Sequence, residues 1–558
     1  MAWKKEELFL IMLLFATASW PSNGDGFSKL NKYPYLREAS SFSTMPKQEY
    51  DYIVVGGGTA GCALGATLSQ KFSVLVLERG GSPYGNPNIS YLENFHIGLA
   101  NSSPNSPVQR FLSTDGVPNH RARVLGGATC INAGFYTRAS PRYVNYAGWD
   151  EELVEESYEW VEKQIVHKPE VAPWQAAVKD ALLEVGVTPF NGLTYEHIIG
   201  TKISGSTFDN NGFRHTAADL LAAGNHLNLH VLLHATVQKI VFDTTDTKPK
   251  AVGVIFEDEN NDVHEAFIKP NGQSEVILSA GAIGTPQLLL LSGVGAEEEL
   301  KKLNIPVVVK NENVGKEMKD NPMSSILIPT MEPQNKSLIQ VVGITNKGFY
   351  IETTSGFGPT DASIVKTNQS LREAFRGGSI GEKIIGPLST GNLSLTSTDI
   401  NANPAVTFNY FSDPEDLRRC VAGVRLILDL AKTRAVAELT GNRSYTDEML
   451  LKMSLEASVN LIPKKGNESE SLEQFCKSSV VTIWHYHGGC LVGKVVDGDY
   501  KVMGVESLRV IDSSLFSFSP GTNPQATVMM LGRYMGVKIT RERFSVASQV
   551  VHSGKSSA

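Results

Sequence analysis

Cysteine is scarce in this chain, and its few residues cannot all be paired. Only five cysteines occur among 558 residues, and an odd number excludes a fully paired disulfide framework. Cys62, Cys130 and Cys490 stand in glycine-rich stretches, where a small buried thiol packs well. Cys420 and Cys476 lie outside such stretches and are therefore the candidate disulfide. The cysteine spacings do not resemble those of a zinc site.

Long apolar runs, an excess of basic residues, internal repeats and low-complexity tracts are also missing. No stretch after the N-terminus is apolar enough to span a bilayer. The net charge of −7 gives no electrostatic reason to expect nucleic acid or an anionic membrane as a partner. A chain of 558 residues with 41% hydrophobic and 20% charged residues is typical of a soluble protein of two to four structural units. We expect a monomer that binds a small molecule.

The N-terminus has the layout of a secretory signal peptide. In "MAWKKEELFLIMLLFATASW", two lysines precede an apolar run, Leu8–Phe15, which small residues follow. The run is too short to cross a membrane. We predict a signal peptide over residues 1–24, with cleavage between Ala18 and Gly24. The alternative is a buried N-terminal helix.

Seven N-x-S sequons agree with passage through the secretory pathway. Such sites on a chain with a signal peptide predict glycosylation and a secreted, extracellular or vacuolar location. The sequons begin at Asn88, Asn101, Asn335, Asn368, Asn392, Asn442 and Asn467.

The strongest local motif begins at residue 51. "DYIVVGGGTAGCALGATLSQKFSVLVLERGG" predicts a buried strand at Ile53–Val55, a glycine turn, a helix and a second strand. Gly56 permits a tight turn, Gly58 lets a pyrophosphate approach the backbone, and Gly61 lets the helix pack on the strand. Glu78 ends the second strand and can accept hydrogen bonds from ribose hydroxyls. The motif predicts a dinucleotide site for NAD or FAD; the alternative is a glycine turn without a ligand.

Two further stretches bear on the choice of dinucleotide. "ARVLGGATCINAGFYTR", residues 122–138, predicts a loop whose backbone lies against a flat ring or a phosphate. "GAIGTPQLLLLSGVG", residues 281–295, follows the strand "EVILSA" and predicts a glycine turn and a helix with Pro286 in its first turn.

These stretches closely resemble the two signature patterns of the glucose–methanol–choline (GMC) family of FAD-dependent oxidoreductases. The element at residue 51 resembles that family's ADP-binding element, and "GVESLRVIDSSLFSFSPGTNPQATVMMLG" resembles its last flavin-contacting segment. One departure is Ala128, where the family usually has a small hydroxyl residue or glycine. "YEWVE", "TYEHIIGTKISGSTFDNNGFRHTAADLL" and "WHYHGGCLVG" resemble the plant (R)-mandelonitrile lyase, or hydroxynitrile lyase, subgroup.

The resemblance implies an α/β fold, α+β overall. A Rossmann-like FAD-binding domain would comprise residues 51–150, 230–300 and 485–545. A discontinuous antiparallel-sheet substrate domain would comprise residues 151–229 and 301–484, where "NLSLTST" and "AVTFNYF" alternate like strands.

The resemblance also implies a bound FAD, which we expect to be noncovalent. His120 lies near the segment where some relatives attach flavin, and the residue alone does not decide attachment. The expected cofactor-binding residues are Gly56, Gly58, Thr59, Ala60, Gly61, Glu78, Arg79, Val124, Ala128, Asn132, Ala133, Gly134, Phe135, Val237, Trp484, Asp512, Pro524 and Gln525.

Two histidines in "WHYHGGCLVG" are candidates for the family's acid/base group. The resemblance places His485 at the flavin's reactive edge and Asn523, in an Asn-Pro dipeptide, at the second catalytic position. Neutral His485 can accept an alcohol proton, and the Asn523 amide can orient the substrate oxygen. His487 is expected to be a packed histidine. A metal site is not predicted, because no carboxylate or thiolate cluster completes one.

The pocket departs from that of the plant lyases. They have a second histidine where this chain has Asn523, and a tyrosine where it has Ile483. A lyase cysteine that touches substrate aligns with Glu352, so Ile483 and Glu352 are the expected substrate residues. We therefore predict oxidation of a small alcohol, aromatic or aliphatic, ahead of cleavage of a cyanohydrin such as mandelonitrile to an aldehyde and HCN. A catalytically weak secreted flavoprotein is the third alternative.

Overall fold

The segment after residue 50 folds as a strand, a glycine turn, a helix and a second strand. In the computed structural model, β3 (Tyr52–Val55) and β4 (Val74–Leu77) are buried along their length, and α3 (Thr59–Leu68) connects them. The structure describes residues 33–45, 49–101, 103, 105–357, 377–462 and 471–553, with side chains as far as residue 545. The predicted signal peptide, residues 1–24, lies outside these residues.

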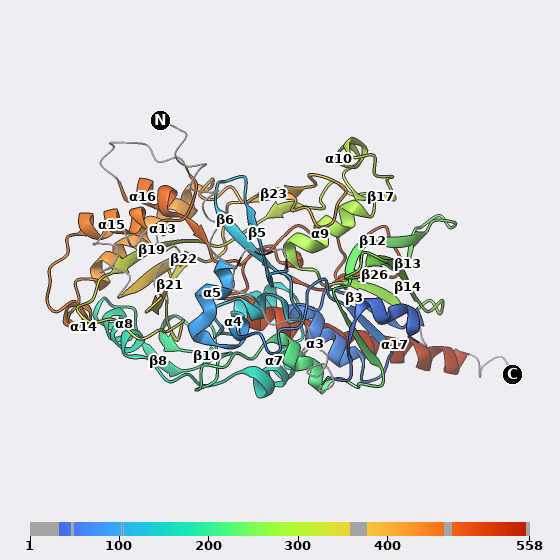
Figure 1. Cartoon of the computed structure of the whole chain (residues 1–558), viewed down its shortest axis with the longest axis horizontal. Helices are drawn as coiled ribbons and strands as arrows, with labels where there is room; N and C mark the ends of the chain where they lie inside the picture. The colour runs from blue at the N-terminus through green and yellow to red at the C-terminus, as the bar shows by residue number, and fades with distance from the viewer. Residues whose placement is uncertain are drawn as a thin grey trace. The chain divides into compact units, whose positions relative to one another are not determined.

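β3 and β4 belong to a six-stranded sheet in the order β1-β11-β4-β3-β15-β26, of which β3 and β26 are labelled in Figure 1. Every neighbouring pair in it is parallel. Because parallel strands end at one edge of a sheet, the turns that follow them meet at that edge. The other strands are β1 (Leu36–Glu38), β11 (Leu229–Leu233), β15 (Glu275–Leu278) and β26 (Leu508–Val510).

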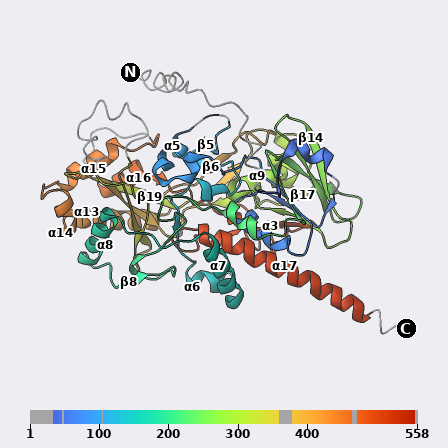
Figure 2. The same cartoon turned by 60° about the horizontal axis from the view of Figure 1, so that its bottom comes forward.

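Two helices complete the arrangement around this edge. α9 (Gly281–Leu291) follows β15, and the long α17 (Gln525–Ser553) packs against α3 (Figure 2). The prediction for Pro286 was wrong in detail. α9 begins at Gly281, so Pro286 is its sixth residue rather than part of its first turn. At that position proline cannot donate the backbone hydrogen bond to Ala282.

A seven-stranded sheet forms the other large layer, in the order β25-β19-β22-β21-β20-β9-β8. Its neighbours are antiparallel except β8 and β9, which are parallel. The strands are β25 (Val481–Thr482), β19 (Pro322–Ile328), β22 (Gly378–Ile384), β21 (Phe349–Ser355), β20 (Val341–Ile344), β9 (Gly200–Ile203) and β8 (Phe190–Leu193).

The two faces of this sheet have different neighbours because side chains alternate along a strand. On β22, Ile380 and Ile384 enter a large apolar core, whereas Gly381 and Lys383 line a cavity. The core side is covered by α8 (Pro173–Glu184), α13 (Pro414–Leu430), α15 (Asp447–Glu456) and α16 (Leu472–Ser479). The cavity side is where the predicted site residues gather.

Two segments predicted as strands of the large antiparallel sheet lie elsewhere. "NLSLTST" and "AVTFNYF" contribute β23 (Gly391–Ser394) and β24 (Ala405–Thr407), which form a small sheet with β18 (Lys316–Met318). Apolar alternation predicted that they are extended but could not indicate their partners. The contacts divide the chain only at Pro34, so the boundaries predicted between a FAD domain and a substrate domain stay a prediction.

Smaller elements connect these layers. A four-stranded sheet has the order β12-β13-β14-β2, with β12 (Thr236–Asp243), β13 (Lys250–Glu257), β14 (Val263–Ile268) and β2 (Glu49–Tyr50). Further helices are α4 (Pro87–Ser90), α5 (Phe95–Ala100), α6 (Pro141–Tyr146), α7 (Glu151–Ile165), α10 (Glu297–Lys302) and α14 (Arg434–Leu439). Among the described residues, every helix is too short or too polar to cross a bilayer.

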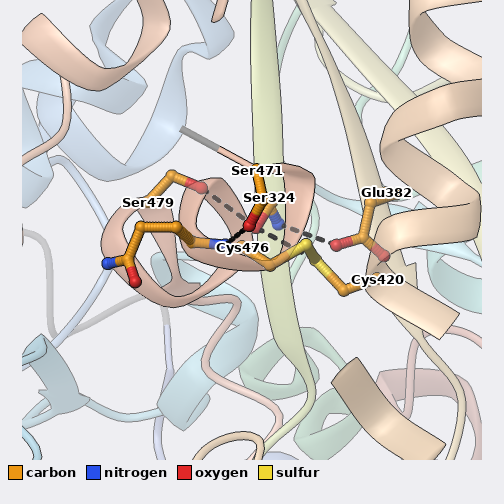
Figure 3. The surroundings of a disulfide bond; sticks show 7 residues. Ser324, Glu382, Cys420, Ser471, Cys476 and Ser479 are labelled. Atoms are coloured by element: carbon orange, nitrogen blue, oxygen red, sulfur yellow. Dashed lines mark hydrogen bonds between the residues drawn. A yellow bond between two sulfur atoms is a disulfide. The ribbon is translucent and has the colours of Figure 1, made fainter. Parts of the chain in front are cut away.

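The predicted disulfide is confirmed. Cys420 on α13 bonds Cys476 on α16, across 56 residues of sequence, and ties the two helices together over β19 (Figure 3). Cys62, Cys130 and Cys490 are free and buried, as their glycine-rich surroundings predicted.

Candidate active site and cofactor site

One cavity of about 420 Å³ lies between the carboxyl ends of the parallel strands and the seven-stranded sheet. It collects nearly every predicted site residue, from segments hundreds of positions apart. The predicted residues in its wall are Gly56, Gly58, Thr59, Ala60, Glu78, Arg79, Val124, Ala128, Asn132, Ala133, Gly134, Phe135, Val237, Glu352, Ile483, Trp484, His485, Asp512, Asn523, Pro524 and Gln525.

The three glycines of the first motif, Gly56, Gly58 and Gly61, have different structural roles. Gly56 has φ +103°, and a Cβ there would lie 2.5 Å from the Ser279 carbonyl oxygen. Gly61 is absent from the cavity wall, and its Cβ would lie 2.0 Å from the Gly56 oxygen, so it serves helix packing. A Cβ on Gly58 would meet no protein atom closer than 3.8 Å and would extend into the cavity. The turn therefore leaves room at Gly58 for a ligand to touch the backbone.

Two buried carboxylates flank this turn. Glu78, after β4, accepts hydrogen bonds from the backbone N–H groups of Gly57 (3.1 Å) and Gly80 (2.8 Å). Asp512, after β26, accepts from the Gly281 N–H (2.9 Å) at the start of α9. Burial raises the pKa of both carboxyl groups. Backbone donors thus fix each carboxylate in the wall, where its free lone pairs can accept from the hydroxyl groups of a ligand.

The loop after Gly126 forms another part of the wall. Gly126, Gly127 and Gly134 have positive φ, which only glycine adopts readily. Asn132 donates to the Gln525 Oε1 (2.8 Å), and Gln525 donates to the Phe135 carbonyl (2.5 Å). These bonds hold the loop against the start of α17 and leave its backbone facing the cavity. Together with the open Gly58 and the fixed Glu78, this surface fits a dinucleotide with a flat ring system, as FAD is.

His485 and His487 have different surroundings although they are two residues apart. His485 lines the cavity, and its Nδ1 has no hydrogen-bond partner among the described residues. His487 is 2% exposed, does not line the cavity, and its Nδ1–H donates to the His485 carbonyl (2.8 Å). Its backbone pairs with Lys319. Trp484, with φ +59°, precedes them and interrupts the extended backbone. The structure therefore directs one histidine to the cavity and packs the other.

Electrostatics keeps the cavity histidine neutral. Burial, the Lys383 ammonium group and His487 hold the pKa of His485 well below its ordinary value of 6.5. Burial also lowers the pKa of His487 to about 4. A neutral imidazole in the wall can accept a proton, which an imidazolium cannot.

Asp320, which sequence reasoning missed, holds the backbone of His485. Its Oδ1 accepts the His485 N–H (3.0 Å), and its Oδ2 accepts the Tyr410 hydroxyl (2.6 Å). Burial raises the pKa of Asp320 to about 7. Asp320 reaches His485 because β19 pairs with β25, with Pro322 opposite Thr482. Its stretch, "KDNP", carries no motif that could have marked it.

Asn523 lines the same cavity, and its Oδ1 has no partner in the described part of the chain. The Tyr350 hydroxyl donates to the carbonyl of the preceding Thr522 (3.3 Å). On the other side, the Ser140 N–H donates to the Pro520 carbonyl (2.8 Å). The segment that carries Asn523 is thus held by β21 and by residues 138–140.

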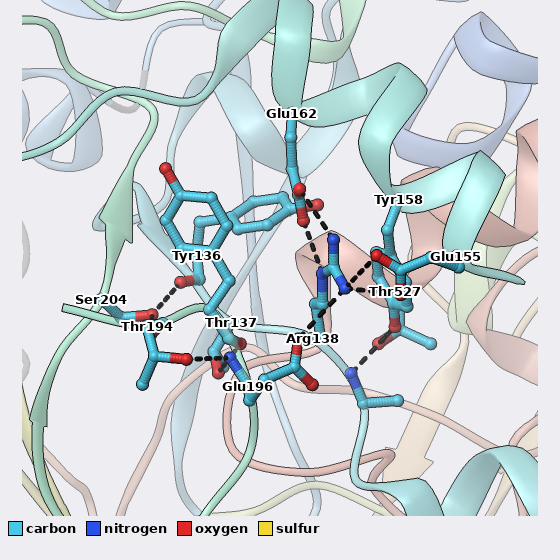
Figure 4. Close-up of polar contacts among 12 residues, drawn as sticks. Tyr136, Thr137, Arg138, Glu155, Tyr158, Glu162, Thr194, Glu196, Ser204 and Thr527 are labelled. Atoms are coloured by element: carbon cyan, nitrogen blue, oxygen red, sulfur yellow. Dashed lines mark hydrogen bonds and ion pairs between the residues drawn. The ribbon is translucent and has the colours of Figure 1, made fainter. Parts of the chain in front are cut away.

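Residues 138–140 are themselves fixed by a charged cluster on α7 (Figure 4). Arg138 pairs with Glu162 (2.7 Å), Glu155 (2.8 Å) and Glu196 (3.0 Å). The Tyr158 hydroxyl accepts the Ala139 N–H (2.8 Å) and contacts the Thr527 hydroxyl (2.9 Å) at the start of α17. The glutamates raise the pKa of Arg138 further, so the cluster stays charged.

The predicted substrate residues also lie in the wall. Ile483 is 7% exposed, and Glu352, on β21, is 2% exposed and forms an ion pair with Lys383 on β22. Lys383 lines the cavity but has no sequence motif, so sequence reasoning missed it. In the part of the chain that the structure describes, His, Cys, Asp and Glu side chains do not gather in threes as metal ligands would.

Comparisons with known proteins agree with this geometry. Two models described as "GMC oxidoreductase" match residues 50–323 and 387–532. The chain is 52% identical to Protein HOTHEAD of Arabidopsis thaliana, over 96% of this chain and 98% of that protein. It is 46% identical to the (R)-mandelonitrile lyase-like protein of Arabidopsis thaliana, over 96% and 97%. It is 44% identical to the sinalpyl alcohol oxidase Nec3 of Nesocodon mauritianus, over 96% and 98%.

Solved structures agree on the fold. A formate oxidase crystal structure superposes with a TM-score of 0.73 at 19% identity, covering 90% of this chain and all of that one. At this identity the likeness speaks for the fold alone.

Proposed function

The chain belongs to the GMC oxidoreductase family, and from this premise we propose that it oxidises a small primary alcohol to its aldehyde. It is an enzyme, its cofactor is FAD, and its relatives place it in the mandelonitrile lyase-like subgroup of plants. The observation that carries the proposal is the pairing in one cavity of a neutral histidine with a free nitrogen, His485, and an asparagine, Asn523.

The residues of the cavity divide into two groups. The turn at Gly56–Gly58, Glu78 and the loop after Gly126 would hold FAD, through backbone donors and the ribose hydroxyls. FAD, when bound, would supply the two-electron acceptor for the hydride of the alcohol carbon, with O2 or another oxidant to restore it. We infer that FAD is bound noncovalently.

His485 would act as the general base. As the C–H hydride leaves the substrate, the O–H proton passes to the neutral imidazole and the C–O bond becomes the aldehyde double bond. Asn523 cannot titrate, so its amide would donate to the substrate oxygen and orient it. His485 thus provides the proton acceptor that the oxidation of one alcohol requires.

Cyanohydrin cleavage is the second candidate, because the 46% identical relative is named mandelonitrile lyase-like. That reaction moves a hydroxyl proton and releases HCN, with no net electron transfer. A second titratable group beside His485 would assist the proton of HCN. Asn523 lines the same cavity as His485 and cannot carry a proton, which favours oxidation.

Anaerobic mixing distinguishes the candidates. The yellow holoenzyme is mixed with a panel of benzylic and aliphatic alcohols, and the flavin absorbance and the aldehyde are followed. Bleaching with one aldehyde formed per flavin supports alcohol oxidation. Cyanide release from mandelonitrile without bleaching, with every alcohol inert, overturns it in favour of the lyase. A flavin that responds to neither substrate indicates a catalytically weak flavoprotein.

We also propose that the protein passes through the secretory pathway. The buried Cys420–Cys476 disulfide supports this, because stable disulfides form in oxidising compartments. A monomer remains our expectation. Mass spectrometry of the purified protein for a mature start between Ala18 and Gly24 and for sequon glycans tests the route, and light scattering tests the monomer.

A further inference from the structure

A buried ion pair faces the cavity from the seven-stranded sheet. Glu352 on β21 and Lys383 on the neighbouring β22 are 2% and 6% exposed, and both belong to the cavity wall. Gly381 lies opposite Glu352 in the register and places no side chain beside the carboxylate. Ser325 and Ser379 line the cavity from the same sheet. The sheet thus offers polar groups to a cavity whose remaining wall is largely apolar.

One oxygen of this pair has no partner. Glu352 Oε2 binds the Lys383 ammonium group, whereas Oε1 is buried and accepts no hydrogen bond from any described residue. A buried carboxylate oxygen without a donor costs on the order of 1–3 kcal/mol or more. Because Glu352 belongs to the wall of the substrate cavity, a ligand that binds beside it can supply the missing donor.

The ion pair also borders the reacting groups. Lys383 is close enough to His485 for its charge to act on the imidazole. Tyr350, on the same face of β21 as Glu352, donates to the Thr522 carbonyl beside Asn523, and the Lys383 Nζ lies 5.9 Å from the centre of its ring. A substrate held at His485 and Asn523 therefore has Glu352 within its own cavity.

We propose that Glu352 selects alcohols that carry a second hydroxyl group, by accepting a hydrogen bond from that hydroxyl at Oε1. This inference rests on the proposed alcohol oxidation. The charge of Glu352 is balanced by Lys383, so the pair favours a neutral hydroxyl over an ammonium group, which Lys383 would repel, or a carboxylate, which Glu352 would repel.

Matched substrates isolate the hydrogen bond. Para- and meta-hydroxybenzyl alcohol are compared with para- and meta-methoxybenzyl alcohol, which have similar ring electronics but no donor. A hydrogen bond to a charged group contributes about 1.5–3 kcal/mol, so kcat/KM for the hydroxylated alcohol should be about 10- to 100-fold higher. Ammonium- and carboxylate-bearing benzyl alcohols, included in the panel, should be the poorest substrates.

Removal of the pair should abolish this preference. Glu352→Met combined with Lys383→Met replaces both charges by side chains of similar volume, a change that buried ion pairs often tolerate. The kcat/KM ratio between hydroxylated and methoxylated alcohols should fall to about one. If this variant binds no FAD, Glu352→Gln keeps the volume and should lower the ratio about tenfold, because the charge-assisted bond becomes a neutral one.

Glu382 provides the matched control. It neighbours Lys383 on β22 and is also buried, but it points to the opposite face, where its Oε1 accepts the Ser324 N–H (3.2 Å) (Figure 3). Burial raises the pKa of Glu382 well above its ordinary value, and Glu382→Gln keeps the side-chain volume on a face that does not line the cavity. The kcat/KM ratio between hydroxylated and methoxylated alcohols in Glu382→Gln should equal that of the wild type.

Three outcomes separate this inference from the proposed function. Equal kcat/KM for both alcohols of each pair overturns the inference and leaves alcohol oxidation intact. A preference that survives in the double variant also overturns it. If no alcohol reduces the flavin, alcohol oxidation fails, and equilibrium binding of the same pairs, read from the flavin spectrum, still decides whether Glu352 prefers the hydroxyl.

Discussion

At the scale of single residues, His485 and His487 show how the same side chain takes two roles. A spacing of two residues on a straight strand would place both histidines on one face, where they could bind one metal ion together. The positive φ of Trp484 breaks that regularity, and the pairing of His487 with Lys319 buries the second ring. Of these two histidines, His485 lines the cavity and His487 does not. The two histidines therefore differ in role because the backbone places their rings in different surroundings, although the rings are chemically identical.

His485→Ala should lower the rate of anaerobic flavin reduction by about 10²- to 10⁴-fold, the usual effect of removing one general base. FAD should stay bound, because the turn at Gly56–Gly58 and Glu78 belong to other segments of the cavity. His487→Ala is the matched control and should lower thermal stability more than rate, since it leaves a cavity in a packed region. Stopped-flow absorbance measures the first effect and thermal melting the second. Equal rate losses in the two variants would contradict the assignment.

The pH dependence should report the same imidazole. Only neutral His485 accepts a proton, so the rate is constant above its pKa and falls as the pH drops through it. Because burial and Lys383 hold this pKa below 6.5, the acidic limb of flavin reduction should lie below pH 6.5. Lys383→Met removes the repulsion and should move the limb to higher pH. A wild-type limb above pH 7 would show that another group titrates.

At the scale of elements, the position of Asn523 depends on a helix that never touches the cavity. α7 supplies Glu155, Glu162 and Tyr158, which fix residues 138–140, and these hold Pro520 in the segment before Asn523. The Arg138 side chain is 11% exposed and that of Glu162 13%, so this pair is largely shielded from water, whereas Glu155 and Glu196 are about half exposed. Removing one partner of a shielded pair is costly, because it leaves the other charge without compensation.

Arg138→Met should therefore lower kcat by about tenfold or more, because an error of about 1 Å in a positioned group can cost up to about 10²-fold. The FAD content should not change. Lys163→Met is the control, because Lys163 lies on α7, the helix that supplies Glu155 and Glu162. Lys163 pairs with Glu159 on the exposed surface, and such pairs contribute about 0–1 kcal/mol. Steady-state kinetics per bound flavin measures the effect. An Arg138 variant that melts earlier but turns over normally would assign the cluster to stability alone.

The sequence predicted elements whose signals are local and missed residues whose importance comes from pairing. The first strand, turn and helix, and Glu78 after the second strand, lie within 30 residues, so one pattern contained the whole unit. Asp320 and Lys383 reach the site only because β19 pairs with β25 and β21 with β22. For the same reason "NLSLTST" was predicted to be extended but was assigned to the wrong sheet. Local patterns do not encode strand partners.

At the scale of the whole molecule, one cavity draws its wall from both large sheets and from α17. Residues from Val55 to Val528 contribute to it, so FAD would contact segments distributed over most of the described chain. A ligand that binds the folded state alone stabilises it in proportion to the logarithm of its concentration. Cofactor binding and folding should therefore be coupled in this protein, and the two can be separated only by a substitution that acts on one of them.

Gly58 and Gly61 allow this separation. In Gly58→Ala the added Cβ meets no protein atom within 3.8 Å, but it enters the space that the pyrophosphate needs. In Gly61→Ala the Cβ would lie 2.0 Å from the Gly56 carbonyl oxygen, so α3 must move away from β3. Gly58→Ala should therefore give folded protein that is colourless or binds FAD weakly, and Gly61→Ala should give little folded protein at all.

Circular dichroism and the flavin absorbance per chain measure the two effects independently. Excess FAD should raise the melting temperature of wild-type apoprotein and leave that of Gly58→Ala nearly unchanged, because only the wild type binds it well.

Gly148→Ala is the control. An added Cβ on Gly148 has no protein atom within 4 Å, but Gly148 lies outside the cavity wall, and its φ of +64° costs about 1 kcal/mol for alanine. The Gly148→Ala protein should bind FAD, be yellow, and be slightly less stable than the wild type. A yellow Gly58→Ala with normal flavin content would show that the pyrophosphate does not lie on this turn.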